Sequence, residues 1–227
     1  MKIGILQTGL VPDELTAEYG QYGDMFARFL DQYGFRHETW SVVSGEFPDG
    51  AEACDGWLIT GSRHGTYEDW PWILPLEQLI RDIVAAKRPL IGVCFGHQII
   101  AQALGGKVVK FDKGFATGPQ LYDFSDGQKV IHAWHGDQVT EPPTGAQTIA
   151  SNEFCAHAAL LYPGKAFTVQ PHPEFDDGFV HGLLDHRAKG VLPEEQISET
   201  YAKLGRELHS NAVLAQFARF YREGQIA

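Results

Sequence analysis

The spacing of apolar and polar positions changes along the chain and predicts alternating strands and helices. Short runs rich in apolar residues, at 3–6, 40–43, 56–60 and 89–93, predict strands, and turn residues follow them. Between these runs, segments starting at Tyr19 and at Trp72 carry apolar residues at helical spacing. This alternation predicts an α/β fold, a doubly wound and mostly parallel sheet with flanking helices.

Beyond Gly106 the pattern changes to short β-like pieces, which predict a small antiparallel extension of the sheet. These pieces lie at 108–111, 120–124, 130–133, 148–151 and 167–170. The tail then returns to helical spacing, with Val213, Phe217 and Phe220 on one face. We therefore expect helices at the C-terminal end.

Composition and charge limit the possible partners. The chain has 227 residues, 44% of them hydrophobic and 21% charged, which is typical of a protein with a packed core. Its net charge of −11 repels phosphate backbones, so we expect no nucleic-acid partner. The apolar runs fall short of the roughly 18 residues that span a membrane, and we expect no membrane partner. Three irregularly spaced cysteines suit a reducing cytoplasm.

The segment Gly92-Val93-Cys94-Phe95-Gly96 lies where an apolar strand gives way to a helical pattern. It is the cysteine counterpart of the G-x-S-x-G nucleophile elbow, a strained turn that lifts the nucleophile above a sheet. A helix N-terminus behind Cys94 favours a thiolate. The alternative is a buried core cysteine between glycines that only allow close packing.

A thiolate nucleophile needs a base, and the segment Pro171-His172-Pro173-Glu174 offers one. In an extended segment, residues two positions apart share a face, so Glu174 could orient the imidazole of His172 towards Cys94. The alternative for this segment alone is a solvated turn.

Taken together, the sequences GVCFGHQ at 92–98 and QPHPE at 170–174 resemble class I glutamine amidotransferases, such as the glutaminase domains of GMP synthase and anthranilate synthase. Within that class, the segment 42–49 together with GVCFGHQII is similar to stand-alone members, including plant γ-glutamyl peptidases. The resemblance implies a flavodoxin-like catalytic domain over residues 1–185. Residues 186–227 would form a helical extension packed on it.

The resemblance also implies roles for individual residues. Cys94 is the nucleophile, His172 the general base and acid, and Glu174 the third member of the triad. The oxyanion hole is formed by backbone N–H groups at Phe95 and in Gly61-Ser62, and the γ-glutamyl pocket is lined by Gln98, His135, Gly136 and Asp137. Thr60-Gly61-Ser62-Arg63 replaces the S-G-G-P of many members, so either Gly61 or Ser62 supplies the second donor.

His132, His135 and Asp137 could also form a metal site with H-x-x-H spacing. In a strand the two histidines point to opposite faces, so we expect no metal. The sequence carries no G-x-x-x-x-G-K-[ST] phosphate loop, and we expect no cofactor.

Three functions remain open. The first is a cysteine hydrolase of γ-glutamyl amides, which converts glutamine to glutamate and ammonia or cleaves γ-glutamyl peptides through a γ-glutamyl thioester. The second is an ammonia-supplying subunit that acts with a synthetase partner. The third is a non-enzymatic binding or regulatory module on the same fold.

Overall fold

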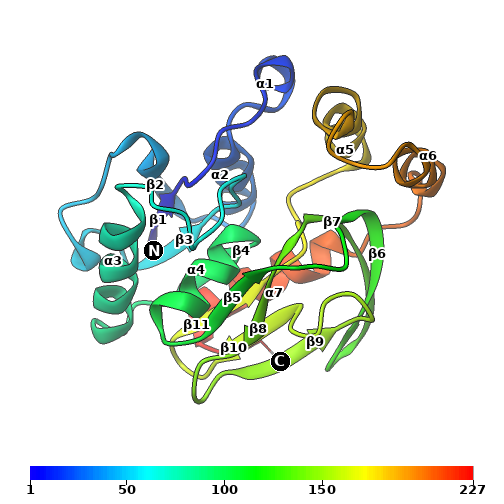
Figure 1. Ribbon diagram of the computed structural model, residues 1–227. Helices are drawn as coiled ribbons and strands as arrows, with labels where there is room; N and C mark the ends of the chain where they lie inside the picture. The colour runs from blue at the N-terminus through cyan, green and yellow to red at the C-terminus, as the bar shows by residue number, and fades with distance from the viewer. Residues whose placement is uncertain (227) are drawn as a thin grey trace.

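A nine-stranded sheet runs through the molecule, in a computed structural model that describes residues 1–226 (Figure 1). Its strand order is β2-β1-β3-β4-β11-β10-β9-β6-β7. The first five strands in this order pair in parallel, and the remaining strands extend the sheet by antiparallel pairing. The predicted α/β class, with a mostly parallel sheet and an antiparallel extension, is confirmed.

The strands are β1 (Lys2–Leu6), β2 (Arg36–Trp40), β3 (Gly56–Ile59), β4 (Leu90–Val93), β5 (Lys107–Lys110), β6 (Ala116–Phe124), β7 (Gly127–His135), β8 (Asp137–Glu141), β9 (Gln147–Ser151), β10 (Ala159–Tyr162) and β11 (Ala166–Val169). The α-helices are α1 (Asp13–Tyr19), α2 (Tyr22–Gln32), α3 (Ile73–Ala85), α4 (Phe95–Ala103), α5 (Asp177–Leu183), α6 (Glu194–Lys203) and α7 (Ser210–Glu223). Single 3₁₀ turns lie at η1 (Val42–Ser44) and η2 (Ala51–Ala53), and a short π-helix, η3 (Leu184–Ala188), follows α5. β5 and β8 form a separate two-stranded sheet.

Helices cover both faces of the parallel strands. On one face α2 and α7 pack side chains such as Phe26 and Phe217 against the sheet. On the other face α3 and α4 contribute residues such as Leu76 and Ile100. Successive residues of β4 belong to opposite faces, as the two-residue period of a strand requires. The continuous apolar runs of the sequence therefore reflect strands that are buried on both sides.

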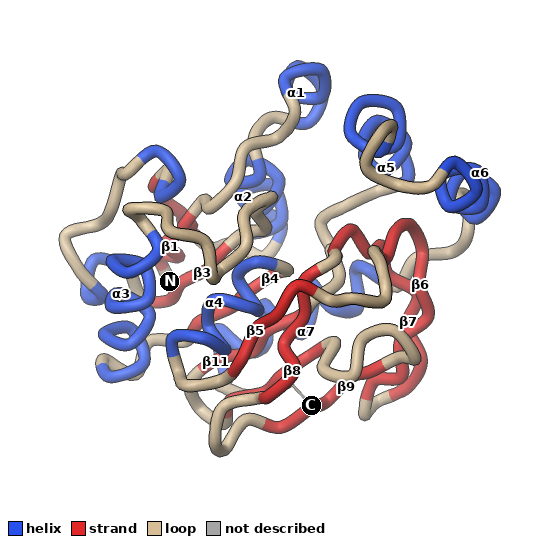
Figure 2. The backbone as a smooth tube through the Cα atoms, viewed as in Figure 1, coloured by secondary structure: helices blue, strands red, loops and turns tan. Residues whose placement is uncertain are grey.

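A third apolar cluster joins α1 and α5, which Figure 2 shows beyond the end of the strands together with α6. Gly178 and Gly182 of α5 allow this close packing. A Cβ atom on Gly178 would lie 2.5 Å from the Tyr19 hydroxyl, and one on Gly182 would lie 2.3 Å from Leu15. The loop that follows β11 therefore leads directly into a helix that packs closely on α1.

The prediction of a strand at 40–43 is wrong in position. The strand is β2, at Arg36–Trp40, and the two valines that follow lie in the turn η1. β2 is an edge strand paired only with β1, and its residues are mostly exposed, so it carries no apolar run that the sequence could reveal. The helix α1 and the strands β8 and β10 were not expected from the sequence.

The C-terminal helices pack on the rest of the chain. α6 lies against β6, and α7 contributes Phe217, Phe220 and Tyr221 to the core cluster that includes β1 and β11. The Tyr221 hydroxyl donates a hydrogen bond to the carbonyl of Trp57. The division of the chain at residue 185 stays a prediction. Among residues 1–226, no helix is long and apolar enough to cross a membrane.

Candidate active site

The predicted site residues lie where three neighbouring strands end. β4 pairs in parallel with β3 on one side and with β11 on the other. Residues 61, 94 and 172 follow the carboxyl ends of β3, β4 and β11, so the sheet brings them to one edge. The N–H of Cys94 donates to the carbonyl of Val169 at 2.9 Å, which ties the start of this turn to β11. Open α/β sheets bind ligands at this edge.

Cys94 occupies the sharp turn expected from the sequence. Its backbone has φ of 52° and ψ of −103°, and it caps the N-terminus of α4. Few non-glycine residues adopt a positive φ, so the turn is strained. A Cβ atom on Gly92 would lie 2.6 Å from the carbonyl of Gly96, and one on Gly96 would lie 2.3 Å from the carbonyl of Ile59. Both glycines are therefore needed for strand and helix to approach this closely.

His172 and Glu174 form a buried pair next to Cys94. The Nδ1 atom of His172 lies 2.7 Å from Oε1 of Glu174, and the side chains are only 4% and 1% exposed. The N–H of His172 donates to the carbonyl of His132 at 2.8 Å, so the backbone of this turn is anchored to β7. Glu174 thus fixes one ring nitrogen and leaves the other free for a second partner.

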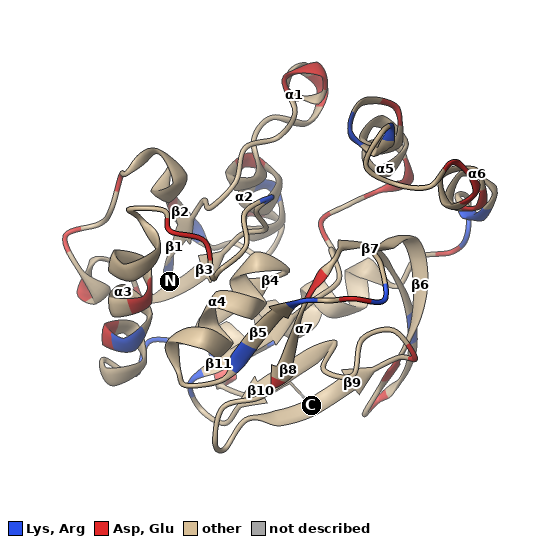
Figure 3. Ribbon diagram, in the orientation of Figure 1, with Lys and Arg blue, Asp and Glu red and all other residues tan. Residues whose placement is uncertain are grey.

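The surroundings raise the pKa of His172. Burial alone lowers the pKa of an imidazole, but the charge of Glu174 and that of Cys94 favour the protonated ring and together raise the pKa to about 10. Figure 3 shows few charged residues near the centre of the sheet, and β3, β4, β11 and α4 carry no Lys, Arg, Asp or Glu. The paired carboxylate therefore acts in apolar surroundings, where its effect is strong.

Two other histidines near the site have pKa values that are lowered, in contrast to that of His172. Burial lowers the pKa of His97 and that of His135 to about 3. Nδ1 of His97 lies 2.8 Å from the hydroxyl of Thr168, and Nδ1 of His135 lies 3.4 Å from the carbonyl of Asp137. Both partners are neutral, so both rings stay uncharged near neutral pH.

The expected oxyanion-hole residues lie next to the buried pair. A Cβ atom on Gly61 would lie 2.9 Å from Cε1 of His172 and 3.7 Å from Cβ of Cys94. Among the hydrogen bonds of residues 1–226, none uses the N–H of Gly61, Ser62 or Phe95. Phe95 is the first residue of α4, where helix N–H groups point outward without an intrahelical partner. These amides could therefore donate to an oxygen placed next to Cys94.

The expected pocket residues form a connected wall. Gln98 lies one helical turn after Cys94, and its Nε2 donates to the carbonyl of Asp137 at 2.9 Å and to Oε1 of Gln170 at 3.0 Å. Gly136 leaves room for the ring of Phe115, because a Cβ atom there would lie 2.8 Å from it. Asp137 is half-buried, which raises the pKa of its carboxyl.

The structure adds neighbours that the motifs did not identify. Tyr67 donates from its hydroxyl to Oδ2 of Asp137 at 3.1 Å, and Thr66 donates to Gln102 at 2.8 Å, so the loop after Gly61 is tied to the wall of the site. Phe175 stacks on His172. In the sequence, the position of Phe175 directly after Glu174 was the one sign that it lies near the site. The contact of Tyr67 joins segments far apart in the chain and left no signal in the sequence.

His132 and His135 do not form a metal site with Asp137. His132 is fully buried and lies 3.0 Å from Asp177 of α5, whereas His135 faces Asp137 and Phe154. In the part of the chain that the structure describes, no group of three or more His, Cys, Asp or Glu side chains is arranged to hold a metal ion.

A cavity of about 380 Å³ lies between β6 and α6, apart from the buried pair. Its lining includes Phe115, Phe154, Gln196 and Lys203 but none of Cys94, His172 and Glu174. Phe115 also contacts Gly136, so this cavity adjoins the outer side of the pocket wall.

Similarities to known proteins extend over most of the chain. The family described as "Glutamine amidotransferase class-I" matches residues 19–180. The chain is 29% identical over 199 residues to γ-glutamyl peptidase 4 of Arabidopsis thaliana, covering 80% of this chain and 79% of that protein. It is 28% identical over 193 residues to a glutamine-hydrolysing GMP synthase of Pyrobaculum aerophilum, covering 82% of this chain but 35% of that protein.

The fold matches solved structures as well. A glutamine amido transferase from Methylobacillus flagellatus superposes with a TM-score of 0.79, at 21% sequence identity, over 99% of this chain and 95% of that one. At this identity the likeness shows the fold alone. Because the family match covers well over half of the sequence, the chain belongs to the class I glutamine amidotransferase family.

Proposed function

We propose that the protein is a cysteine hydrolase of γ-glutamyl amides, with Cys94, His172 and Glu174 as its triad. One observation carries this proposal: the sheet edge brings a strained cysteine next to a buried histidine whose other nitrogen is held by a carboxylate at 2.7 Å. A catalytic triad consists of a nucleophile, a base that takes its proton and a third group that orients the base.

In the proposed reaction, His172 has already taken the thiol proton, and Sγ of Cys94 attacks the side-chain carbonyl carbon of the γ-glutamyl group. The N–H groups of Phe95 and of Gly61 or Ser62 stabilise the negative oxygen that forms. His172 then gives its proton to the leaving nitrogen as the C–N bond breaks, which yields a γ-glutamyl thioester. Water loses a proton to His172 as its oxygen attacks the thioester carbonyl. The C–S bond then breaks, glutamate leaves, and the proton is again shared between His172 and Sγ of Cys94.

We assign selection of the γ-glutamyl group to Gln98, His135, Gly136 and Asp137. The NH₂ of Gln98 is already occupied, so Gln98 acts by holding the backbone of Asp137 in place. The half-buried Asp137 carboxylate has a neutral phenol as its hydrogen-bond partner and suits the α-ammonium group of a γ-glutamyl substrate. Such a pocket accepts a free γ-glutamyl end and leaves the amine open, consistent with the relative named γ-glutamyl peptidase.

The test is a substrate panel on the purified chain: glutamine, γ-glutamyl dipeptides, glutathione and an α-glutamyl control. We expect release of glutamate from the γ-linked substrates alone.

The nucleophile is tested separately. Cys94→Ser should lower kcat/KM by at least about 10³-fold, whereas the matched control Cys54→Ser should change it little. A glutamine-derived chloroketone should label Cys94 and leave Cys54 and Cys155 unmodified, because burial raises the pKa of these two thiols. An adduct on either of these instead, found by peptide mass spectrometry, would remove Cys94 as the nucleophile.

A second candidate is an ammonia-supplying subunit, favoured by the similarity to part of a GMP synthase. In that case, hydrolysis of glutamine by the isolated chain should be weak and should rise when a synthetase partner is added. Hydrolysis of γ-glutamyl dipeptides by the chain alone would argue for the peptidase.

A further inference from the structure

The imidazole of His172 lies flat on the phenyl ring of Phe175. The ring centroids are 4.0 Å apart and the planes differ by 6°. Both side chains are buried, at 4% and 3% exposure. The reaction proposed above uses the two nitrogens of His172 but assigns nothing to the group that covers its face.

A single four-residue turn creates this stack. The N–H of Phe175 donates to the carbonyl of His172 at 3.3 Å, which closes the turn over Pro173 and Glu174. Proline fits the second position of such a turn because its φ is already fixed near the required value. The turn thus supplies the imidazole, the carboxylate that holds Nδ1, and the aromatic ring below the imidazole.

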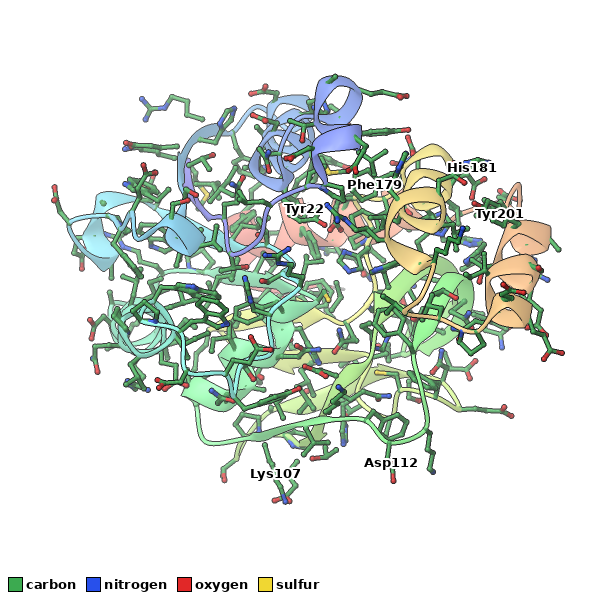
Figure 4. All side chains as sticks on the ribbon, turned by 45° about the horizontal axis from the view of Figure 1, so that its top comes forward. Tyr22, Lys107, Asp112, Phe179, His181 and Tyr201 are labelled. Atoms are coloured by element: carbon green, nitrogen blue, oxygen red, sulfur yellow. The ribbon has the colours of Figure 1, made fainter. Side chains whose placement is uncertain are left out.

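Phe175 is itself held by neighbouring rings. The ring centroid of Phe179 of α5 lies 4.4 Å from that of Phe175. The centroid of Tyr22 of α2 lies 6.2 Å from it, and the two ring planes differ by 24°. Figure 4 shows Tyr22 and Phe179 close together between these helices, and their centroids are 6.2 Å apart. Rings from α2 and α5 therefore pack around Phe175, and Phe175 in turn stacks on His172.

We propose that Phe175 is a positioning residue, which sets the plane of the His172 ring and favours its protonated form. The inference rests on the proposed function of His172. The face of an aromatic ring is negative and attracts a cation, and the attraction is largest where water is excluded. A fixed ring plane also keeps Nε2 directed at its partner while Glu174 holds Nδ1.

Other titratable groups face His172 from three directions. They are Glu174 of its own turn, Cys94 at the start of α4, and His132 and His135 of β7. Tyr22 of α2 lies near Glu174 and Cys94. Asp177 of α5 faces His132 from behind. A replacement of Phe175 removes none of these groups, so we assign a change in the pH profile to the loss of the ring.

The experiment compares Phe175→Leu with the matched control Phe179→Leu, which removes a ring from the same cluster. The readouts are the pH profile of kcat/KM and the rate of Cys94 alkylation by iodoacetamide, followed by peptide mass spectrometry. For Phe175→Leu we expect about a tenfold lower plateau of kcat/KM and a shift of the upper inflection, where His172 releases its proton, to lower pH by about half to one unit. Phe179→Leu should lower the melting temperature but keep the inflection.

Two further replacements keep the shape of the ring and guard against misfolding. Phe175→Tyr retains the ring face and should preserve the inflection. Pentafluorophenylalanine at position 175 reverses the charge of the ring face and should shift the inflection to lower pH. An unchanged inflection in the Leu and fluorinated variants, or an equal shift in Phe179→Leu, would overturn the proposal. If the wild type hydrolyses no γ-glutamyl substrate, the proposed function fails, and the alkylation profile still decides the role of Phe175.

Discussion

Two buried histidines, one in the candidate site and one on the helix that follows Cys94, show how a single partner decides the charge of a ring. His172 and His97 are both almost fully buried, at 4% and 0% exposure. The pKa of His172 is raised to about 10, whereas that of His97 is lowered to about 3. Burial opposes the charged form in both, so the difference comes from the groups that each ring contacts.

His172 contacts a carboxylate, and His97 contacts a hydroxyl. Glu174 supplies a full negative charge at 2.7 Å, and Cys94 adds to it. Thr168 offers His97 a neutral oxygen at 2.8 Å, and Nε2 of His97 has no partner among the described residues. Of two equally buried rings, only the one with a carboxylate can carry a proton to a leaving group near neutral pH.

The strongest test of this comparison is the removal of each ring in turn. His172→Ala should lower kcat/KM for a γ-glutamyl substrate by at least about 10³-fold, because no proton carrier remains. His97→Asn should change it by less than about tenfold, since His97 moves no proton. Steady-state assays with matched far-UV circular dichroism would check both. Near-normal turnover by His172→Ala would mean that another residue is the base.

A smaller effect should follow when the charge of the partner is removed. Glu174→Gln keeps the shape of the side chain but takes away its negative charge, so the pKa of His172 should fall. The alkaline limb of the kcat/KM profile should then move to lower pH, with an activity loss of about 10²-fold that stays below the loss in His172→Ala. A profile that keeps its alkaline limb would show that Glu174 does not set the protonation of His172.

The smallest effect concerns the stability contributed by His97. Its folded pKa is lowered below the unfolded value, so its contribution to the free energy of unfolding is present above about pH 6.5 and is lost as pH falls towards 3. Between these two pH values, the free energy of unfolding that His97 contributes falls by about 1.4 kcal/mol per pH unit. His97→Asn should be less stable than the wild type at pH 7 but lose less stability between pH 6 and pH 4. Urea unfolding at several pH values would show the two slopes, and equal slopes would contradict the assignment.

The sequence predicted most of the strands that are buried on both sides, although it missed the largely buried β10. β3, β4 and β11 carry apolar runs because helices cover both of their faces, and their order fixed the sheet edge where the site lies. β2 was misplaced because an edge strand needs no apolar run. α1 was missed because only Leu15 of its seven residues is buried, which gives almost no periodicity.

The same division holds for the candidate site. Cys94 and the pair of His172 and Glu174 could be predicted, because glycines and prolines at fixed spacing mark the turns that hold them. The contacts of Tyr67 with Asp137 and of His132 with Asp177 join segments distant in the sequence. Such contacts depend on how the loops and α5 pack over the sheet edge, and no local pattern encodes that packing.

The pairing of β4 with β11 also affects the order in which the protein becomes reactive during synthesis. The ribosome delivers Cys94 with β4, then the whole antiparallel extension, and only afterwards β11 with His172 and Glu174. Until β11 inserts between β4 and β10, the thiol has no base beside it and one edge of β4 has no partner strand. In the proposed mechanism, activation of the thiol is thereby coupled to completion of the sheet, and a chain interrupted before β11 would combine an unactivated cysteine with an aggregation-prone strand edge.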